Sequence, residues 1–157
     1  MMTVENSPIF VDTNILVYAN LAKSPFHLTA KERLRLLSEQ GADLWVSRQV
    51  LREYLAAMTR RDILTEAIPV SFLVADVRYF AGYFQVAEED SQVTERLLEL
   101  MEKVPTGGRQ VHDANIVATM QVYGIRHLLT HNTVDFKRFS DIITVLPIDV
   151  NDQDSKT

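Results

Sequence analysis

The chain has 157 residues, 46% of them hydrophobic, which is enough for one buried core without spare length for a second domain. It contains no cysteine, and this excludes disulfides, thiolate metal sites and cysteine nucleophiles. The net charge of −5 argues against broad, non-specific affinity for nucleic acid, because such affinity needs clustered lysine and arginine.

The N-terminal stretch shows no sign of a targeting or membrane segment. It carries Glu5 and no basic residue before Pro8, and Asp12 and Asn14 break the apolar run that follows. A signal peptide needs a basic start and a longer apolar core, and a membrane helix needs about 20 apolar residues. We therefore expect a cytoplasmic protein that has no membrane partner.

The first predicted element is a strand that runs into a helix. Residues 9–11 form a continuous β-favouring run that is typical of a buried parallel strand. The run stops at Asp12, and Thr13 and Asn14 are available to cap a helix that starts near Ile15. A carboxylate at this strand end is either a helix cap or a ligand, and we favour the ligand.

The strand-and-helix alternation continues along the chain. Residues 29–32 have the form of a capping box, which predicts a helix that ends at Gly41. Residues 44–46 then predict a strand, and Ser47 is expected to cap the next helix. The later elements are predicted as a helix in two pieces over 63–83 broken near Pro69, a strand over 84–86, a helix from Asp90 or Ser91 to Val104, a helix over 111–123 closed by Gly124, and strands over 125–130 and 142–146.

Strands separated by helices favour a parallel sheet with helices on both faces. The expected fold is therefore α/β, a single three-layer α/β/α domain over residues 1–150 with a central, mostly parallel sheet, followed by a polar tail over 151–157. In such sheets, ligands bind outside the carboxyl ends of the strands. The ligand-binding or catalytic site is therefore expected at the carboxyl ends of the strands.

Four carboxylates sit where an apolar pattern ends or is broken, and they are the most informative feature of the chain: Asp12, Glu53, Asp113 and Asp135. A carboxylate buried without a partner costs several kcal/mol, so four of them near buried elements indicate a shared cation. Oxygen ligands of this kind suit Mg²⁺ or Mn²⁺.

The four positions differ in how strongly they indicate a ligand. On an ideal helix Asp113 falls within the apolar arc and is expected to face the core, although Arg109 or a capped backbone could also compensate its charge. Glu53 lies on the flank of its helix's apolar arc, where a surface glutamate is common. Asp135 follows a strand in a polar loop and could instead cap the next turn. Thr130 and Asn132 of that loop are expected to hydrogen-bond the acids or a bound water.

The sequence does not support three other common kinds of site, namely a histidine zinc site, a catalytic triad and a P-loop. The four histidines do not form a zinc-binding spacing, and no Ser-His-Asp triad is apparent. The pair Gly107-Gly108 is not followed by Lys-Ser or Lys-Thr, so a phosphate-binding P-loop is not supported.

Taken together, these segments resemble the PIN-domain family and, within it, the VapC-like toxins of toxin–antitoxin pairs. The resemblance rests on four segments in order along the chain: Ile9 to Tyr18 with Asp12-Thr13-Asn14, Val46 to Glu53, His112-Asp113-Ala114 with Ile116-Val117-Ala118, and Thr130-His131-Asn132 with Asp135-Phe136. It implies a three-layer α/β/α fold and a Mg²⁺- or Mn²⁺-dependent endoribonuclease that hydrolyses single-stranded RNA. It also implies homodimerisation and inhibition by a cognate antitoxin of a type II system.

The resemblance also assigns residues. The first three family acids fall on Asp12, Glu53 and Asp113, and the fourth falls on Asn132 or Asp135, of which we choose Asp135. The residues expected to support the ligands by hydrogen bonds are Thr13, Asn14, Thr130 and Asn132. Those expected to contact RNA phosphates, rather than only to lie on solvated helix faces, are Arg48, Arg52 and Arg109.

Two other functions are kept as alternatives. A haloacid-dehalogenase-like phosphatase also places an aspartate after its first strand, but it needs a second aspartate where this chain has Asn14. A non-catalytic binding module with the same fold would use the apolar 63–83 region to dock a protein partner. The presence of all four acids argues against loss of catalysis.

Overall fold

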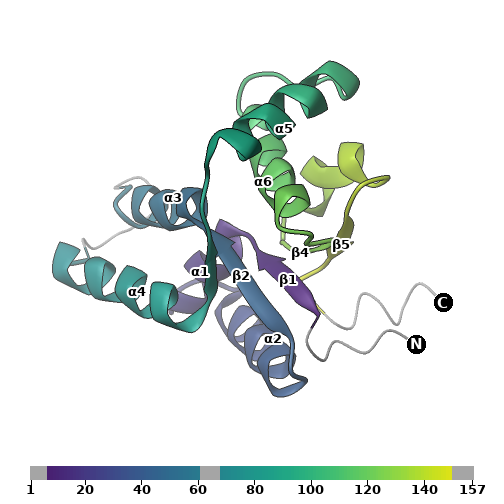
Figure 1. Cartoon of the computed structure of the whole chain (residues 1–157). Helices are drawn as coiled ribbons and strands as arrows, with labels where there is room; N and C mark the ends of the chain where they lie inside the picture. The colour runs from purple at the N-terminus through teal and green to yellow at the C-terminus, as the bar shows by residue number, and fades with distance from the viewer. Residues whose placement is uncertain (1–6, 61–67, 150–157) are drawn as a thin grey trace.

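Five short strands, all parallel, form the centre of the molecule, and helices connect them (Figure 1). The computed structural model describes residues 7–60 and 68–149. The elements in chain order are β1 (Pro8–Val11), α1 (Thr13–Asn20), α2 (His27–Glu39), β2 (Asp43–Ser47), α3 (Arg48–Met58), α4 (Val70–Tyr83), β3 (Gln85–Ala87), α5 (Ser91–Lys103), α6 (Gln110–Val122), β4 (His127–Leu129), the 3₁₀ helix η1 (Thr133–Phe139) and β5 (Thr144–Leu146).

The strand order across the sheet is β3-β2-β1-β4-β5. In the middle strand, Ile9 is paired with Leu44 of β2 on one side and with His127 of β4 on the other. Every neighbouring pair is parallel, so the predicted α/β class with a parallel central sheet is confirmed. All five predicted strands are present, within a few residues of their expected ends.

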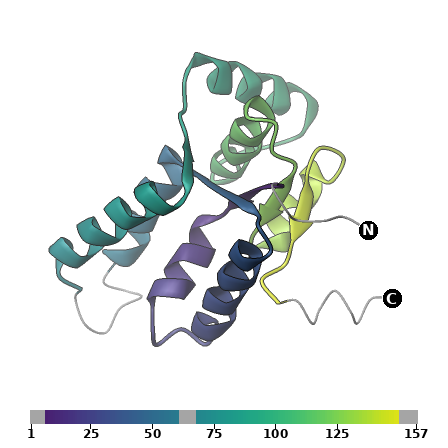
Figure 2. The same ribbon diagram turned by 60° about the horizontal axis from the view of Figure 1, so that its bottom comes forward.

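Helices cover both faces of the sheet, as Figures 1 and 2 show together. Parallel strands are joined by right-handed crossovers, so the chain puts its helices on one face while it moves in one direction across the sheet and on the other face when it returns. The connections from β1 to β3 carry α1, α2, α3 and α4, and those from β3 to β5 carry α5, α6 and η1. The result is the predicted three-layer α/β/α arrangement.

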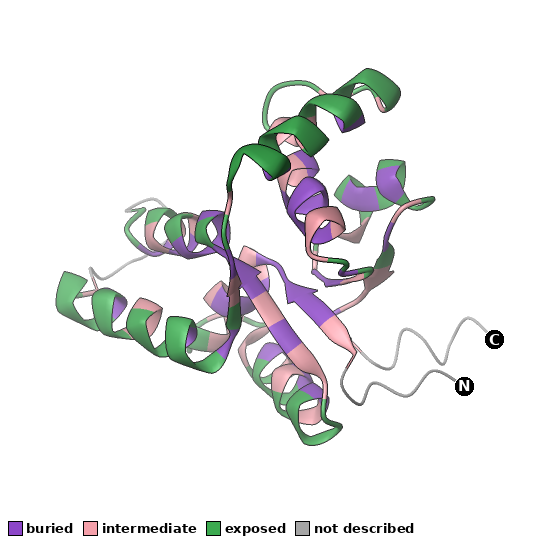
Figure 3. Ribbon diagram, in the orientation of Figure 1, coloured by how far each residue is buried: buried purple, intermediate pink, exposed green. Residues whose placement is uncertain are grey.

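The middle of the sheet is the core of the molecule. In β1, Ile9 is 1% exposed and Phe10 and Val11 are fully buried, and Leu128 and Leu129 of β4 are fully buried beside them. Figure 3 shows the buried positions concentrated on the strands and on the inner sides of the helices. Burial on both faces explains why these strands are continuous apolar runs rather than alternating ones.

The helix start after β1 differs from the prediction. Helix α1 begins at Thr13 rather than near Ile15, and Asp12 is its N-cap, with a side-chain oxygen that accepts a hydrogen bond from the Thr13 amide. The expectation that Thr13 or Asn14 caps this helix is therefore wrong. The Thr13 side chain instead donates to Glu53, and the Asn14 side chain donates to Asp12 and to Thr130.

The start of α2 is also misplaced in the sequence analysis. The helix begins at His27, two residues before the predicted capping box, and Thr29 is not its cap. A turn at Ser24, whose hydroxyl accepts from the Phe26 amide, leads into the helix instead. Phe26 is held there by its ring contacts with Tyr18 and His131, which no local pattern reveals.

Other predicted helix ends are confirmed. The Ser47 hydroxyl caps α3 by accepting from the Val50 amide, and Asp90 caps α5 by accepting from two amides of its first turn. Gly41 and Gly124 follow α2 and α6 with φ values of 83° and 69°, the left-handed conformation that a glycine adopts at low cost. Helix α4 begins directly after Pro69, as predicted.

Part of the sequence analysis concerns residues outside the described ranges. These are most of the first piece of the helix predicted over 63–83 and the polar tail over 151–157. The division of the chain at residue 150 stays a prediction for the same reason. Among the helices of residues 7–60 and 68–149, none is both long enough and apolar enough to cross a membrane.

Candidate active site

The candidate site lies where the strand order reverses. From β1 the chain proceeds to β2 and β3 on one side of the sheet, and it returns to place β4 and β5 on the other side. Such a reversal leaves a crevice at the carboxyl ends of the two strands that flank it, here β1 and β4. Asp12 directly follows β1, Thr130 directly follows β4, and the Asp12 amide donates to the Leu129 carbonyl at 3.0 Å.

Asp12 is buried at this point, with 6% of its surface exposed. Its carboxylate accepts three hydrogen bonds, from the Thr13 amide at 2.8 Å, from Asn14 Nδ2 at 3.1 Å and from Thr130 Oγ1 at 2.7 Å. Burial raises the pKa of Asp12 to about 6, the negative charge of Glu53 adds to the rise, and the three hydrogen bonds oppose it. The group is therefore mostly ionised at neutral pH.

Thr130 joins the end of β4 to the start of α1. Its hydroxyl donates to Asp12 and accepts from Asn14 Nδ2 at 3.2 Å and from the Asn132 amide at 3.0 Å. One donor and two lone pairs are all that a threonine hydroxyl has. Asn14 Oδ1 in turn accepts from the His131 amide at 3.0 Å. The loop after β4 is thus held against Asp12 by a closed set of hydrogen bonds.

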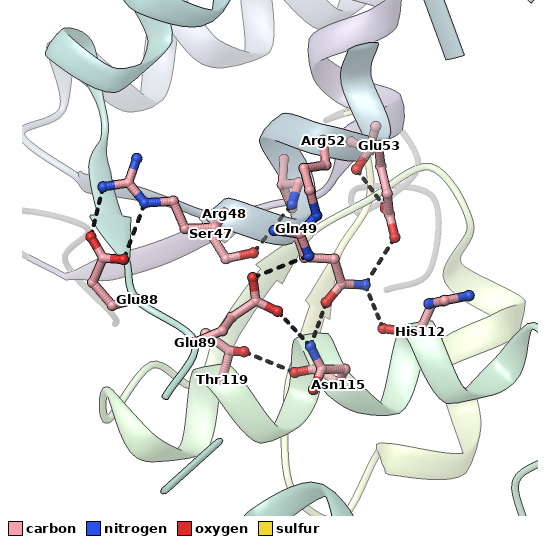
Figure 4. A network of polar contacts seen from close by, with 12 residues as sticks. Ser47, Arg48, Gln49, Arg52, Glu53, Glu88, Glu89, His112, Asn115 and Thr119 are labelled. Atoms are coloured by element: carbon pink, nitrogen blue, oxygen red, sulfur yellow. Dashed lines mark hydrogen bonds and ion pairs between the residues drawn. The ribbon is translucent and has the colours of Figure 1, made fainter. Parts of the chain in front are cut away.

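The four residues predicted to support the acids all take part in this network, Asn132 through its backbone amide. Thr13 reaches a second acid, because its hydroxyl donates to Glu53 Oε2 at 2.9 Å. Glu53 lies on α3, and its other oxygen, Oε1, accepts from Gln49 Nε2 at 2.9 Å (Figure 4). Asp12 and Glu53, which lie on different elements, are therefore joined through Thr13.

Asp113 lies in the first turn of α6 and is partly buried. Burial is the main reason that its pKa is raised to about 6, and the negative charges of Asp12, Asp135 and Glu53 raise it further, whereas Arg138 lowers it. The other three predicted acids therefore all act electrostatically on Asp113. The prediction that Asp113 faces inward agrees with this partial burial.

Asp135 is the most exposed of the four acids. The segment expected to be a polar loop is the 3₁₀ helix η1, and Asp135 lies in its first turn rather than at its cap. Its amide donates to the Asn132 carbonyl at 3.2 Å. Asp135 is close enough to raise the pKa of Asp113.

Carboxylate oxygens dominate the site, and this donor chemistry fits Mg²⁺ or Mn²⁺. In the ranges that the structure describes, no group of three or more acidic or histidine side chains is arranged so that it could hold a metal ion. The fit is one of ligand type and of charge, since the negative charges of three other carboxylates raise the pKa of Asp113. The described side chains do not by themselves form a complete set of metal ligands.

Of the arginines proposed for RNA contact, two are engaged within the protein. Arg48 pairs with Glu88 at 2.6 Å, and Arg52 Nη2 lies 3.7 Å from Glu89 Oε2. Both glutamates follow β3 (Figure 4). Arg109 is exposed immediately before α6. The assignment of these side chains to RNA phosphates stays a prediction.

The sequence analysis missed one buried polar group that touches the site. Gln49 is 4% exposed and contacts Glu53, the His112 carbonyl and Asn115, and Asn115 also contacts Glu89 (Figure 4). Two features of the sequence could have revealed this group. Gln49 is four residues before Glu53 and so lies on the same helix face, and Glu89 comes three residues after the strand predicted over 84–86.

Several solved structures have the same fold, and three of them are compared with this chain. VapBC2 from Rickettsia felis, bound to a DNA fragment from its promoter, has a TM-score of 0.63 at 19% identity, covering 89% of this chain and 98% of that chain. VapC20 from Mycobacterium tuberculosis, a toxin that cleaves the sarcin–ricin loop, has a TM-score of 0.65 at 20% identity, covering 87% and 96%. VapBC-1 from nontypeable Haemophilus influenzae has a TM-score of 0.63 at 16% identity, covering 90% and 98%. Identities this low establish likeness of fold.

A comparison with curated protein sequences finds no match. The sequence itself matches the PIN domain over residues 9–142, which includes β1 and all four predicted acids. The match covers most of the chain and is consistent with the parallel central sheet and the three-layer α/β/α fold. The chain belongs to the PIN-domain family.

Proposed function

We propose that the chain is a metal-dependent endoribonuclease that hydrolyses phosphodiester bonds in single-stranded RNA, and that it is the toxin of a type II toxin–antitoxin pair. The observation that carries the proposal is the link between Asp12 and Glu53 through Thr13, together with the effect of the charges of Asp12, Glu53 and Asp135 on Asp113. The pKa of Asp113 is raised by burial and by the charges of the other three. Membership of a family of nucleases supports the same chemistry.

The residues that would hold the metal are the same four acids. They come from the end of β1, from α3, from α6 and from η1. Mutual repulsion raises the free energy of this group of charges, and a divalent cation would lower it. When bound, Mg²⁺ or Mn²⁺ supplies Lewis-acid stabilisation of phosphate oxygens and a lowered pKa for a bound water.

The chain's own residues prepare the carboxylates for this role. Thr130, Asn14 and the Thr13 amide donate to Asp12 and so favour its ionised form against the effect of burial. Thr13 also donates to Glu53, so one residue orients two acids. Because these donors are fixed by α1 and by the end of β4, the acids need little rearrangement when a ligand arrives.

The proposed partner besides RNA is an antitoxin protein, and a homodimer is proposed as the assembled state. Helix α4 exposes several large apolar side chains that a monomer would leave in water. A groove of about 350 Å³ runs beside it, between α4, α1 and α2. The exposed side chains on α4 are Val70, Phe72, Val74, Tyr79 and Tyr83. This surface supports the docking of an apolar segment of the antitoxin.

The proposal is tested by incubating the purified protein with assorted single-stranded RNAs in Mg²⁺, in Mn²⁺ and in EDTA. Cleavage is expected with either ion and not in EDTA. Asp12→Asn and Asp113→Asn are expected to abolish it, since each removes one of the charges that would hold the cation.

Two controls make this result specific. Circular dichroism of both variants should match that of the unaltered protein, so that loss of activity does not reflect unfolding. Double-stranded DNA in the same assay should stay intact. Unchanged cleavage by both variants, or cleavage that continues in EDTA, would refute the proposed mechanism.

A further inference from the structure

A buried glutamine lies directly behind Glu53. Gln49 is in the first turn of α3, and its Nε2 donates to Glu53 Oε1 at 2.9 Å and to the His112 carbonyl at 2.9 Å. Both hydrogens of the amide are therefore used. One of these bonds holds the acid, and the other ties α3 to α6 one residue before Asp113 (Figure 4).

Asn115 determines which way round the Gln49 amide lies. Its Nδ2 donates to Gln49 Oε1 at 2.7 Å and to Glu89 Oε1 at 2.8 Å. Since Asn115 presents an NH₂ group to Gln49, the glutamine must present its oxygen to Asn115 and its own NH₂ group to Glu53. The reversed amide would set the glutamine oxygen against the glutamate carboxylate and two NH₂ groups against each other.

Glu89 completes the chain of contacts. A carboxylate only accepts hydrogen bonds, so it requires the NH₂ group of Asn115 to face it. Its second oxygen, Oε2, is shielded from water and makes no hydrogen bond with another described residue, and Arg52 Nη2 lies 3.7 Å from it. Asn115 thus donates to Glu89 on one side and to Gln49 on the other, and Gln49 in turn donates to Glu53.

We propose that Gln49 is a positioning residue for Glu53, and that Asn115 and Glu89 fix its amide in the orientation that donates to this acid. The inference rests on the proposed function, in which Glu53 helps to hold a divalent cation. With Thr13 on Oε2 and Gln49 on Oε1, Glu53 is held at both oxygens, which prevents its side chain from turning away. Loss of such a partner behind a metal ligand typically costs about 10- to 100-fold in metal affinity or activity.

The first test replaces Gln49 by methionine, which keeps its length and volume but removes both ends of the amide. Gln92→Met, at an exposed position of α5, is the matched control. Calorimetry with MnCl₂ alone, without RNA, should show binding weakened about 10- to 100-fold in Gln49→Met and unchanged in Gln92→Met. In the RNA assay, kcat should fall while KM for RNA stays the same.

A double-mutant cycle distinguishes positioning from a general structural role. In a Glu53→Gln background, Gln49→Met should cause no further loss of Mn²⁺ affinity, because its effect acts through Glu53. Asn115→Leu should cause a smaller loss than Gln49→Met, because the glutamine then rotates between two orientations. Asn115→Leu carries the test alone if Gln49→Met fails to fold.

The outcomes separate this inference from the proposed function. Equal Mn²⁺ binding and kcat in the unaltered protein and in folded Gln49→Met would overturn the role of Gln49 and leave the nuclease intact. Equal losses from Gln49→Met with and without Glu53 would also overturn it. An unaltered protein that neither binds Mn²⁺ nor cleaves RNA would overturn the proposed function, and the role of Gln49 with it.

Discussion

Replacing Asp12 by asparagine is expected to stabilise the metal-free protein while it abolishes RNA cleavage. The pKa of Asp12 rises from 3.8 to about 6 on folding, so the folded state binds this proton more tightly than the unfolded state. The stability linked to the proton is fully present below pH 3.8 and is lost as the pH rises through about 6. At neutral pH the ionised group therefore opposes folding.

The size of this effect follows from the two pKa values. At pH 7 the difference corresponds to about 3 kcal/mol. Asparagine removes this cost, but its NH₂ group then replaces one of the two oxygens. Because Oδ2 accepts two hydrogen bonds and Oδ1 only one, the NH₂ group is expected at the Oδ1 position, where it loses the bond from the Thr13 amide. One lost hydrogen bond costs about 1 kcal/mol, so the net gain is about 1 to 2 kcal/mol. In a domain of this size that corresponds to a melting temperature higher by about 2 to 8 °C.

The assay is urea unfolding followed by circular dichroism, in EDTA, at pH 7.5 and at pH 4.5. The asparagine variant should be more stable than the unaltered protein at pH 7.5, and the advantage should shrink by at least about 1 kcal/mol at pH 4.5. RNA cleavage by the variant should be undetectable at both pH values. A variant that is less stable by the same amount at both pH values would refute the view that the buried carboxylate opposes folding.

Three further predictions follow from the same geometry. Thr130→Val removes the hydroxyl that serves Asp12, Asn14 and Asn132, and it should lower the free energy of unfolding by about 1 to 3 kcal/mol in urea denaturation. Asp90→Ala removes the α5 cap and should cost about 1 kcal/mol in the same assay while RNA cleavage is unchanged. Mg²⁺ at 100 times its dissociation constant should stabilise the unaltered protein by about 2.7 kcal/mol in thermal melting, and Asp113→Asn should respond much less.

Each of these predictions has a control and an outcome that contradicts it. For Thr130→Val the control is Thr94→Val on the exposed side of α5. If both variants lower the free energy of unfolding equally, the hydrogen bonds of the Thr130 hydroxyl do not stabilise the protein. For Asp90→Ala, a loss of cleavage without a loss of stability would show that α5 has a part in the chemistry. For Mg²⁺, equal stabilisation of Asp113→Asn and of the unaltered protein would place the ion elsewhere.

The sequence determined the features that depend on near neighbours in the chain. The caps at Ser47 and Asp90 and the glycines after α2 and α6 were predicted because their hydrogen bonds and backbone angles involve only a few adjacent residues. The strands were predicted because burial on both faces requires continuous apolar runs. The parallel sheet and the three layers followed from the same patterns.

Only the tertiary structure decided which side chains meet. Thr130 reaches Asp12 across 118 positions, and this contact exists because β4 lies next to β1, an order that hydrophobic patterning does not specify. Gln49 and Asn115 are 66 positions apart, and their contact depends on how α3 lies against α6. Phe26 begins α2 where its ring packs on Tyr18 and His131, in place of the predicted cap. Local sequence patterns determine where single helices and strands form and how they end. Contacts between elements depend on the strand order and on packing across the sheet.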